Sequence, residues 1–163
     1  MKKKILLFAF AVISVATLHA QSNVGFSGGI RLGLPVGDFG DSHSFGIGAE
    51  IQGEARLASN VTIPFSAGYT HFIGKEFLGA RVDGVGLIPI LAGVHIYPSP
   101  QFFIGGKLGY GVLTGGGDSE GAFNYEPRLG YNGSKVQVAL GYNGLTKDGS
   151  TLGHIALLTM IKF

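Results

Sequence analysis

The sequence contains no cysteine in its 163 residues. This absence excludes disulfides, thiolate chemistry and a lipoprotein acylation site. Beyond the first twenty residues the chain also lacks any run of roughly 18 apolar residues, the length that marks a membrane-spanning helix. The longest apolar stretch, 85–97, is interrupted by Gly86, Pro89, Gly93 and His95. We therefore expect no helical membrane spans after residue 20.

Charge is scarce as well, since only 13% of the residues are Asp, Glu, Lys or Arg. Three of the 12 basic residues are the lysines at 2–4, and they precede an apolar run at 5–15 and a small-residue cleavage site. This pattern predicts a signal peptide over 1–20 that is removed after Ala20, with cleavage after Ala16 as the second choice. Subtracting the three lysines leaves nine basic against ten acidic residues, a net charge of −1. That balance offers no basic surface for nucleic acid.

What the chain does contain is period-two alternation of apolar residues, which predicts β-strands. Three short connections, at 58–60, 98–100 and 132–134, consist of turn-forming residues. Longer connections alternate with them at 35–44, 72–85, 114–121 and 144–151. The eight expected strands are 24–34, 45–57, 61–71, 86–97, 101–113, 122–131, 135–143 and 152–163.

Strict alternation of short and long connections places all long loops at one rim and all short turns at the other. Outer-membrane barrels have this asymmetry, with the short turns on the periplasmic side. We therefore predict an all-β fold for 21–163, an eight-stranded antiparallel up-and-down transmembrane β-barrel located in the cell outer membrane.

The two faces of the predicted strands differ in charge. One face can be chosen so that none of its 43 positions is charged, from Val24, Phe26 and Gly28 on the first strand to Phe163 on the last. A charge that faces lipid near the midplane costs roughly 2–4 kcal/mol, which favours such segregation. Aromatic residues on this face concentrate near strand ends, as in the aromatic girdles of membrane barrels. They are Phe45, Tyr69, Tyr110, Phe123 and Tyr142 toward the long loops, and Phe26, Phe102, Tyr131 and Phe163 toward the short turns.

On Gly109-Tyr110-Gly111, Leu129-Gly130-Tyr131-Asn132 and the ending Ile161-Lys162-Phe163, the chain resembles the small outer-membrane β-barrel domain family. The architecture of that family is the eight-stranded one of OmpA- and OmpX-like proteins, and the resemblance covers essentially all of 21–163. It implies insertion by the outer-membrane assembly machinery, which in this family recognises the last strand, so Phe163 is the expected assembly signal. The resemblance implies no catalytic residue.

Charged residues on the opposite face form the candidate site. Glu50 and Glu54 are four residues apart on one strand, with Arg56 next in line. A small barrel leaves room only for side chains, and buried charges require partners, which favours an internal ion-pair lattice. A charged lining of a narrow ion path and an acid–base carboxylate pair are the alternatives. The expected lumen charge network is Arg31, Glu50, Glu54, Arg56, Lys107, Glu126, Arg128 and Lys135.

Catalytic and metal-binding arrangements are weakly indicated. His43 and Ser44 offer the residue types of a lipid-modifying enzyme, but neighbours on a strand point to opposite faces. His43 with Asp38 and Asp41 has no distinctive metal-ligand spacing. No catalytic residue, metal or cofactor is therefore predicted.

Two apolar stretches on the inner face are consistent with a packed plug or with a pocket for a hydrophobic molecule. They are Leu87, Pro89 and Leu91 on one strand, and Ala156, Leu158 and Met160 on another.

The predicted function is that of an integral outer-membrane β-barrel with a structural or surface-interaction role and without catalysis. Its expected partners are outer-membrane lipids, lipopolysaccharide and the assembly machinery. The first alternative is a narrow porin or hydrophobic-solute channel, and the second is a lipid A-modifying enzyme. A soluble lipid-binding barrel is the remaining class. No motif in the predicted loops indicates an external ligand.

Overall fold

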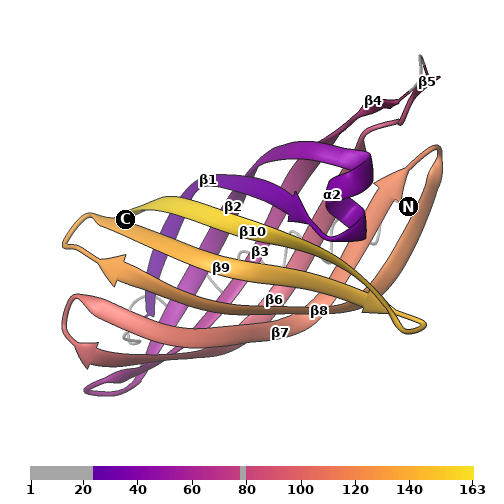
Figure 1. Cartoon of the computed structure of the whole chain (residues 1–163). Helices are drawn as coiled ribbons and strands as arrows, with labels where there is room; N and C mark the ends of the chain where they lie inside the picture. The colour runs from indigo at the N-terminus through magenta and orange to yellow at the C-terminus, as the bar shows by residue number, and fades with distance from the viewer. Residues whose placement is uncertain (1–23, 78–79) are drawn as a thin grey trace, which may run out of the picture.

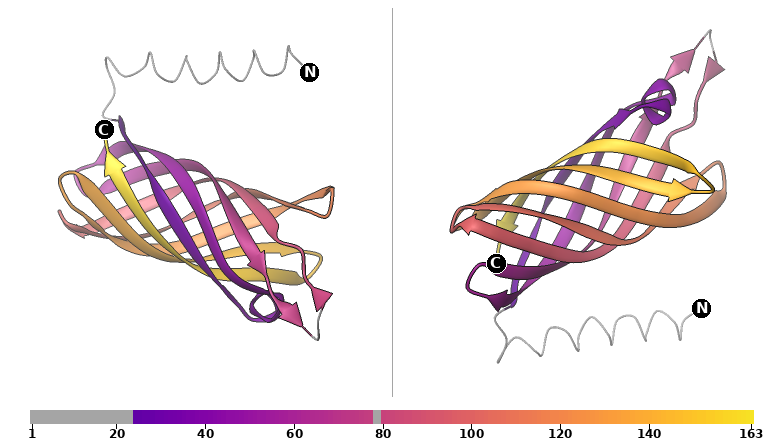
Figure 2. Two further views of the ribbon diagram at one scale, coloured as in Figure 1. Left: turned by 90° about the horizontal axis from the view of Figure 1, so that it is seen from above. Right: turned by 60° about the horizontal axis from the view of Figure 1, so that its bottom comes forward.

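The computed structural model describes residues 24–77 and 80–163, and the predicted signal peptide, 1–20, lies outside the described residues. Eight antiparallel strands close into one barrel in which consecutive strands pair and the last pairs with the first (Figures 1 and 2). The barrel strands are β1 (Val24–Val36), β2 (His43–Ala58), β3 (Val61–Gly74), β6 (Val85–Ser99), β7 (Phe102–Gly115), β8 (Asp118–Asn132), β9 (Val136–Lys147) and β10 (Ser150–Lys162). The prediction of an all-β, eight-stranded up-and-down barrel is confirmed.

The two rims of the barrel differ. Short turns at 59–60, 100–101 and 133–135 lie at one rim, the turn end, where β1 begins and β10 finishes. The other rim, the loop end, carries the five-residue helix α2 (Asp38–Ser42) and the small sheet of β4 (Glu76–Phe77) with β5 (Ala80–Arg81), as Figure 1 shows. Across the described ranges no helix is long and apolar enough to cross a bilayer.

The predictions of long loops at 114–121 and 144–151 are wrong, because strand pairing continues through most of both segments. The β7–β8 hairpin pairs up to Gly115 and Asp118, around two glycines with φ of 61° and 91°. The β9–β10 hairpin pairs up to Lys147 and Ser150, around Asp148-Gly149 with φ of 49° and 84°. Positive φ at both central residues is the condition for a tight hairpin turn that matches strand twist. The loop end therefore projects as paired hairpins at these two places.

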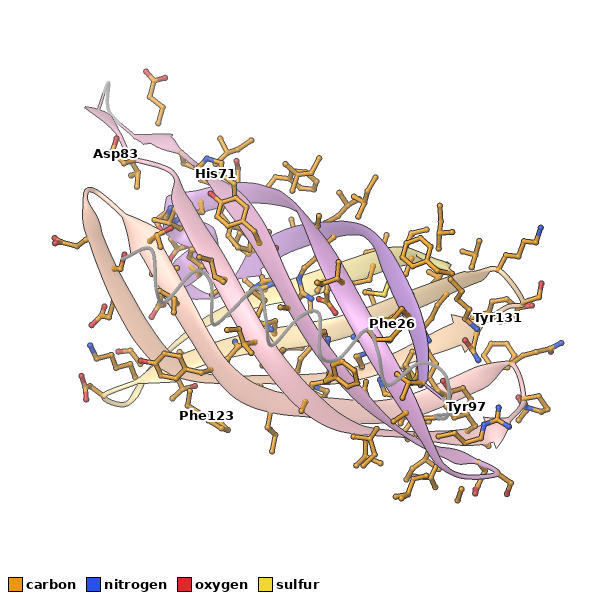
Figure 3. The ribbon with its side chains drawn as sticks, turned by 180° about the vertical axis from the view of Figure 1, so that it is seen from behind. Phe26, His71, Asp83, Tyr97, Phe123 and Tyr131 are labelled. Atoms are coloured by element: carbon orange, nitrogen blue, oxygen red, sulfur yellow. The ribbon has the colours of Figure 1, made fainter. Side chains whose placement is uncertain are left out.

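The outer face of the barrel is apolar around its whole circumference, as the alternation predicted. Exposed side chains on it include Ile51 on β2 (68%), Ile90 on β6 (59%) and Leu129 on β8 (60%). Aromatic residues mark both ends of this face: in Figure 3, Phe123 lies toward the loop end and Phe26 and Tyr131 toward the turn end. An exterior of this kind is suited to contact with hydrocarbon. The polar side chains that alternate with the apolar ones along each strand therefore point into the barrel.

Candidate functional site

A cluster of five buried charged side chains, called the ion-pair layer below, crosses the middle of the lumen. It comprises Arg31 from β1, Glu50 from β2, Lys107 from β7, and Glu126 and Arg128 from β8. Arg31 Nη1 lies 2.6 Å from Glu50 Oε2, and its Nη2 donates to Glu126 Oε2. Lys107 Nζ lies 2.7 Å from Glu50 Oε1 and 3.5 Å from Glu126 Oε1. Each side chain is at most 1% exposed, so the charges have one another and nearby amides as partners, and Lys107 Nζ also donates to Ser66 Oγ at 2.8 Å.

Uncharged polar groups complete the ion-pair layer. Arg128 Nη2 donates to Gln52 Oε1 at 2.7 Å, and Asn143 Nδ2 donates to Glu126 Oε2 at 3.0 Å. Burying a charge is costly unless it is paired and hydrogen-bonded. Each charge of the layer is paired and hydrogen-bonded across six strands, with only Arg31 Nε and Arg128 Nε lacking a partner among the described residues. The layer therefore ties opposite walls of the barrel together.

A hydrophobic plug closes the lumen on the loop side of the ion-pair layer. Phe39 of α2 turns into the barrel mouth, where it is 4% exposed and its ring centroid lies 4.9 Å from that of Phe72. The buried members of this cluster are Phe39, Phe72, Leu87, Ala122 and Leu145. The inner apolar residue Leu87 thus belongs to a packed plug.

A second apolar cluster fills the lumen on the turn side of the ion-pair layer. Its buried members are Phe103, Ala139, Ala156, Leu158 and Met160. The guanidinium carbon of Arg128 lies 5.6 Å from the centroid of the Phe103 ring, so this cluster packs directly against the charged layer. Three successive layers of side chains therefore fill the bore.

Glu54 forms a separate polar centre nearer the turn end. Its Oε1 accepts from the hydroxyls of Thr62 and Tyr97, the latter at 2.6 Å, and lies 3.0 Å from His95 Nδ1. Its Oε2 accepts from the Nε2 atom of Gln137 at 3.3 Å and, at 3.4 Å, from that of Gln52. Glu54 makes no ion pair with an Arg or Lys among the described residues, but Gln52 links it to the ion-pair layer, since Gln52 donates to Glu54 and accepts from Arg128.

Arg56 and Lys135 do not contact the ion-pair layer, although the sequence predicted them in one network with it. Both are exposed at the turn end, and neither forms an ion pair within 24–77 and 80–163. The physical reason is their position at the rim, where water can solvate a charge that the narrow middle of the barrel cannot. The structure thus brings five of the eight predicted charges into direct contact, links Glu54 to them through Gln52, and places Arg56 and Lys135 at the rim.

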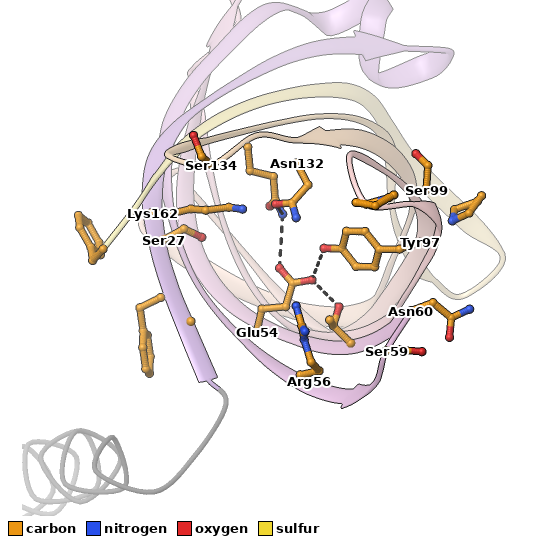
Figure 4. A pocket seen from close by; sticks show the side chains of 17 residues that line it. Ser27, Glu54, Arg56, Ser59, Asn60, Tyr97, Ser99, Asn132, Ser134 and Lys162 are labelled. Atoms are coloured by element: carbon orange, nitrogen blue, oxygen red, sulfur yellow. Dashed lines mark hydrogen bonds between the residues drawn. The ribbon is translucent and has the colours of Figure 1, made fainter.

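A polar cavity with a volume of about 650 Å³, called the turn-side vestibule below, opens at the turn end. Figure 4 shows its side chains gathered around Glu54, with Lys162 and Arg56 approaching from different strands. Lys162 Nζ donates to the carbonyl oxygen of Gly133 at 2.8 Å. The polar lining residues are Ser27, Glu54, Arg56, Ser59, Asn60, Thr62, Tyr97, Ser99, Asn132, Ser134, Gln137 and Lys162.

Comparisons with known proteins identify the fold. No protein-family model matches the sequence, and no curated protein matches it significantly. Among solved structures, Ail, the attachment invasion locus protein of Yersinia pestis, is similar with a TM-score of 0.60 and 16% identity, over 87% of this chain and 99% of that one. The N-terminal barrel domain of Pseudomonas aeruginosa OprF gives 0.59 and 12%, over 87% and 98%. Neisserial surface protein A gives 0.54 and 15%, over 87% and 98%.

This chain has the fold of the small eight-stranded outer-membrane β-barrels. Because the identities are low, the similarity concerns the fold and not a particular activity. Ail is also described in complex with the heparin analogue sucrose octasulfate. The fold accounts for the apolar exterior and the polar lumen of this chain, since in such barrels lipid-facing and lumen-facing residues alternate along each strand.

The pair considered from the sequence, His43 and Ser44, is not arranged as a nucleophile and its base. His43 is buried in the loop-end mouth with its Nδ1 2.8 Å from Ser42 Oγ, whereas Ser44 is exposed and donates to the carbonyl oxygen of Ile73. His43 and Ser44 thus point to opposite faces, as their adjacency on a strand predicts. No group of three His, Asp or Glu side chains in the described part of the chain could hold a metal ion.

Several lumen residues were not predicted. Phe39 and Phe72 fall in segments interpreted as loops, and a five-residue helix is too short to give a helical periodicity. Phe103 could have been predicted from the sequence, because it directly follows the outward-facing Phe102 on a predicted strand and therefore falls on the inner face. The alternation therefore could have located Phe103, while the inward fold of α2 has no local sequence signature.

Proposed function

We propose that this protein is an integral outer-membrane barrel that is closed to solutes, presents its loop end outside the cell, and acts through that surface without catalysis. The observation that carries the proposal is the filled bore. The apolar plug around Phe39, the ion-pair layer and the cluster around Phe103 succeed one another along the lumen. A barrel filled in this way serves as a stable membrane anchor for its rim.

The exterior supports residence in a membrane. Its apolar side chains suit contact with outer-membrane lipids, and lipopolysaccharide would surround the loop end. We also propose that residues 1–20 direct export and that Phe163 marks the last strand for the assembly machinery. Phe163 is 87% exposed, and its backbone N–H donates to the carbonyl oxygen of Phe26 at 2.9 Å across the β1–β10 seam.

The loop end has a distinct charge. It carries seven acidic residues against three basic ones, a formal net charge of −4, and they are Asp38, Asp41, Glu76, Asp83, Asp118, Glu120 and Asp148 against Lys75, Arg81 and Lys147. This sign disfavours a polysulfated ligand such as the one described with Ail. Electrostatic complementarity favours a cationic partner and makes the encounter sensitive to salt.

Planar-bilayer recording tests whether the barrel is closed. The purified, folded protein should give no unitary conductance, because apolar and paired side chains occupy each level of the bore. The E54Q and R56Q variants should be equally silent, since both residues lie outside the three filling layers.

Conductance steps that change in amplitude or ion selectivity in E54Q or R56Q would contradict the proposal and favour a narrow porin. Folded protein is verified for each preparation by its heat-modifiable mobility in gels. An open porin reconstituted into the same membranes shows that insertion is detectable.

A further inference from the structure

The turn-side vestibule has the volume of a small-molecule site. Ligand pockets typically measure about 300–1,000 Å³, and this cavity measures about 650 Å³. Its entrance lies at the turn end, and Tyr97 in its wall packs against the apolar cluster around Phe103. The proposed membrane orientation would make that entrance periplasmic, although the chemistry of the cavity does not depend on it.

The Glu54 carboxylate of the vestibule is already hydrogen-bonded. Glu54 is the only Asp or Glu among the described lining residues. Both Glu54 oxygens are hydrogen-bonded from inside the barrel wall, Oε1 by Thr62, Tyr97 and His95, and Oε2 by Gln52 and Gln137. A carboxylate offers about four lone-pair sites, so Glu54 has little capacity left for a ligand.

The donor capacity, in contrast, is largely free. Lys162 Nζ donates one hydrogen bond, to Gly133, and has two further N–H groups. Arg56 lines the same cavity and has no carboxylate partner within the described residues. A guanidinium presents a planar fork that matches a carboxylate or a phosphate through two parallel hydrogen bonds. Glu54 lines the same cavity and balances one of the two positive charges, so these three side chains together carry a net charge of +1.

We propose that the turn-side vestibule binds a small organic anion through Arg56 and Lys162. The anion carries a carboxylate or phosphate group held by the two cations. The rest of the anion should carry hydrogen-bonding groups, since Ser59, Asn60, Ser99 and Ser134 also line the cavity. This oxyanion chemistry is shared by soluble metabolites and by the headgroups of anionic phospholipids.

Titration of isotope-labelled protein tests the proposal. The folded protein in an uncharged detergent is titrated with citrate and, separately, with glycerol 3-phosphate, and amide signals are followed by NMR. At least one probe should cause saturable shifts at vestibule residues, including Gly133 and Ser134. R56Q and K162Q should each weaken that binding about tenfold or more, because each removes a charged hydrogen-bond donor.

Lys135 provides the matched control. It is a rim cation whose carbonyl oxygen accepts the backbone N–H of Lys162, yet it does not line the cavity. K135Q should bind as tightly as wild type. Equal weakening by K135Q would reduce the effect to general attraction toward a basic rim and overturn the proposal.

Nanodiscs separate the two sources of the anion. If citrate and glycerol 3-phosphate fail in detergent, the protein is compared in phosphatidylcholine discs with and without phosphatidylglycerol. Vestibule shifts that require phosphatidylglycerol and are lost in R56Q support a lipid headgroup as ligand. Absence of shifts with both soluble probes and with the anionic lipid would overturn the proposal. Each result is independent of bilayer conductance.

Discussion

At the residue scale, the stability of the barrel depends on charges that have no access to water. Glu126 is fully buried and is contacted by Arg31, Lys107 and Arg128. The ion-pair layer already holds three cations against two carboxylates, a net charge of +1. Loss of either carboxylate would raise this excess inside a low-dielectric bore, where an uncompensated charge is costly.

Glu126→Gln should therefore lower the free energy of unfolding by about 3–5 kcal/mol, the range found when one member of a buried ion pair is removed. Urea unfolding of the lipid-reconstituted protein, followed by gel mobility, measures this change. Glu120→Gln is the control, because Glu120 also pairs with a lysine, Lys147, but in an exposed hairpin. An unfolding midpoint of Glu126→Gln equal to that of Glu120→Gln would contradict the stabilising role of the layer.

At the element scale, the strands approach one another so closely that some positions exclude any side chain. A Cβ on Gly29 of β1 would lie 1.9 Å from the carbonyl oxygen of Thr159 on β10. This contact lies at the β1–β10 seam, where the barrel closes. The neighbouring Gly28 faces outward, and its nearest contacts, to the ring of Phe163, are at 3.6 Å.

Gly29→Ala should destabilise the barrel by about 1–3 kcal/mol, because backbone of the partner strand has to move. Gly28→Ala, one residue away on the same strand, should be neutral or stabilise slightly, since it restricts the unfolded chain without a clash. Urea midpoints of the two variants in the same vesicles make the comparison. Equal midpoints would show that the seam has more room than the structure indicates.

At the scale of the whole molecule, the closed barrel has a defined polarity. Both described chain ends lie at the turn end with the basic rim residues Arg56, Lys135 and Lys162, while the loop end is acidic. Among the described residues, no charged side chain lies on the outer surface between the rims. These features together determine how the barrel can sit in an asymmetric membrane.

Phe163→Ala should reduce the folded, heat-modifiable protein recovered from outer membranes to a minor fraction of wild type, because the proposed assembly signal is lost. Phe102→Ala is matched to it, since Phe102 is another exposed aromatic at the turn end. Both purified variants should refold in detergent to a similar extent, which separates assembly from stability. Equal recovery of both variants in cells would contradict a specific role of Phe163.

The intact mass of the recovered wild type should correspond to a chain that starts at Gln21.

Much of the architecture was determined by local pattern. Alternation of apolar and polar residues identified the strands and their outward faces, because a lipid exterior tolerates no charge and each strand has only two faces. The same rule places Arg31, Glu50, Lys107, Glu126 and Arg128 inside. It says nothing about which of them meet, because partners come from strands that are distant in sequence.

Tertiary structure decided the rest. The diameter and register of the closed barrel determine the inward fold of α2 with Phe39, the polar surroundings of Glu54, and the turn-side vestibule. The hairpin at Asp148-Gly149 illustrates the difference between what the local sequence predicts and what the tertiary structure determines. Its turn residues are visible in the sequence, but the pairing that extends the strands to Lys147 and Ser150 is a property of neighbouring backbones.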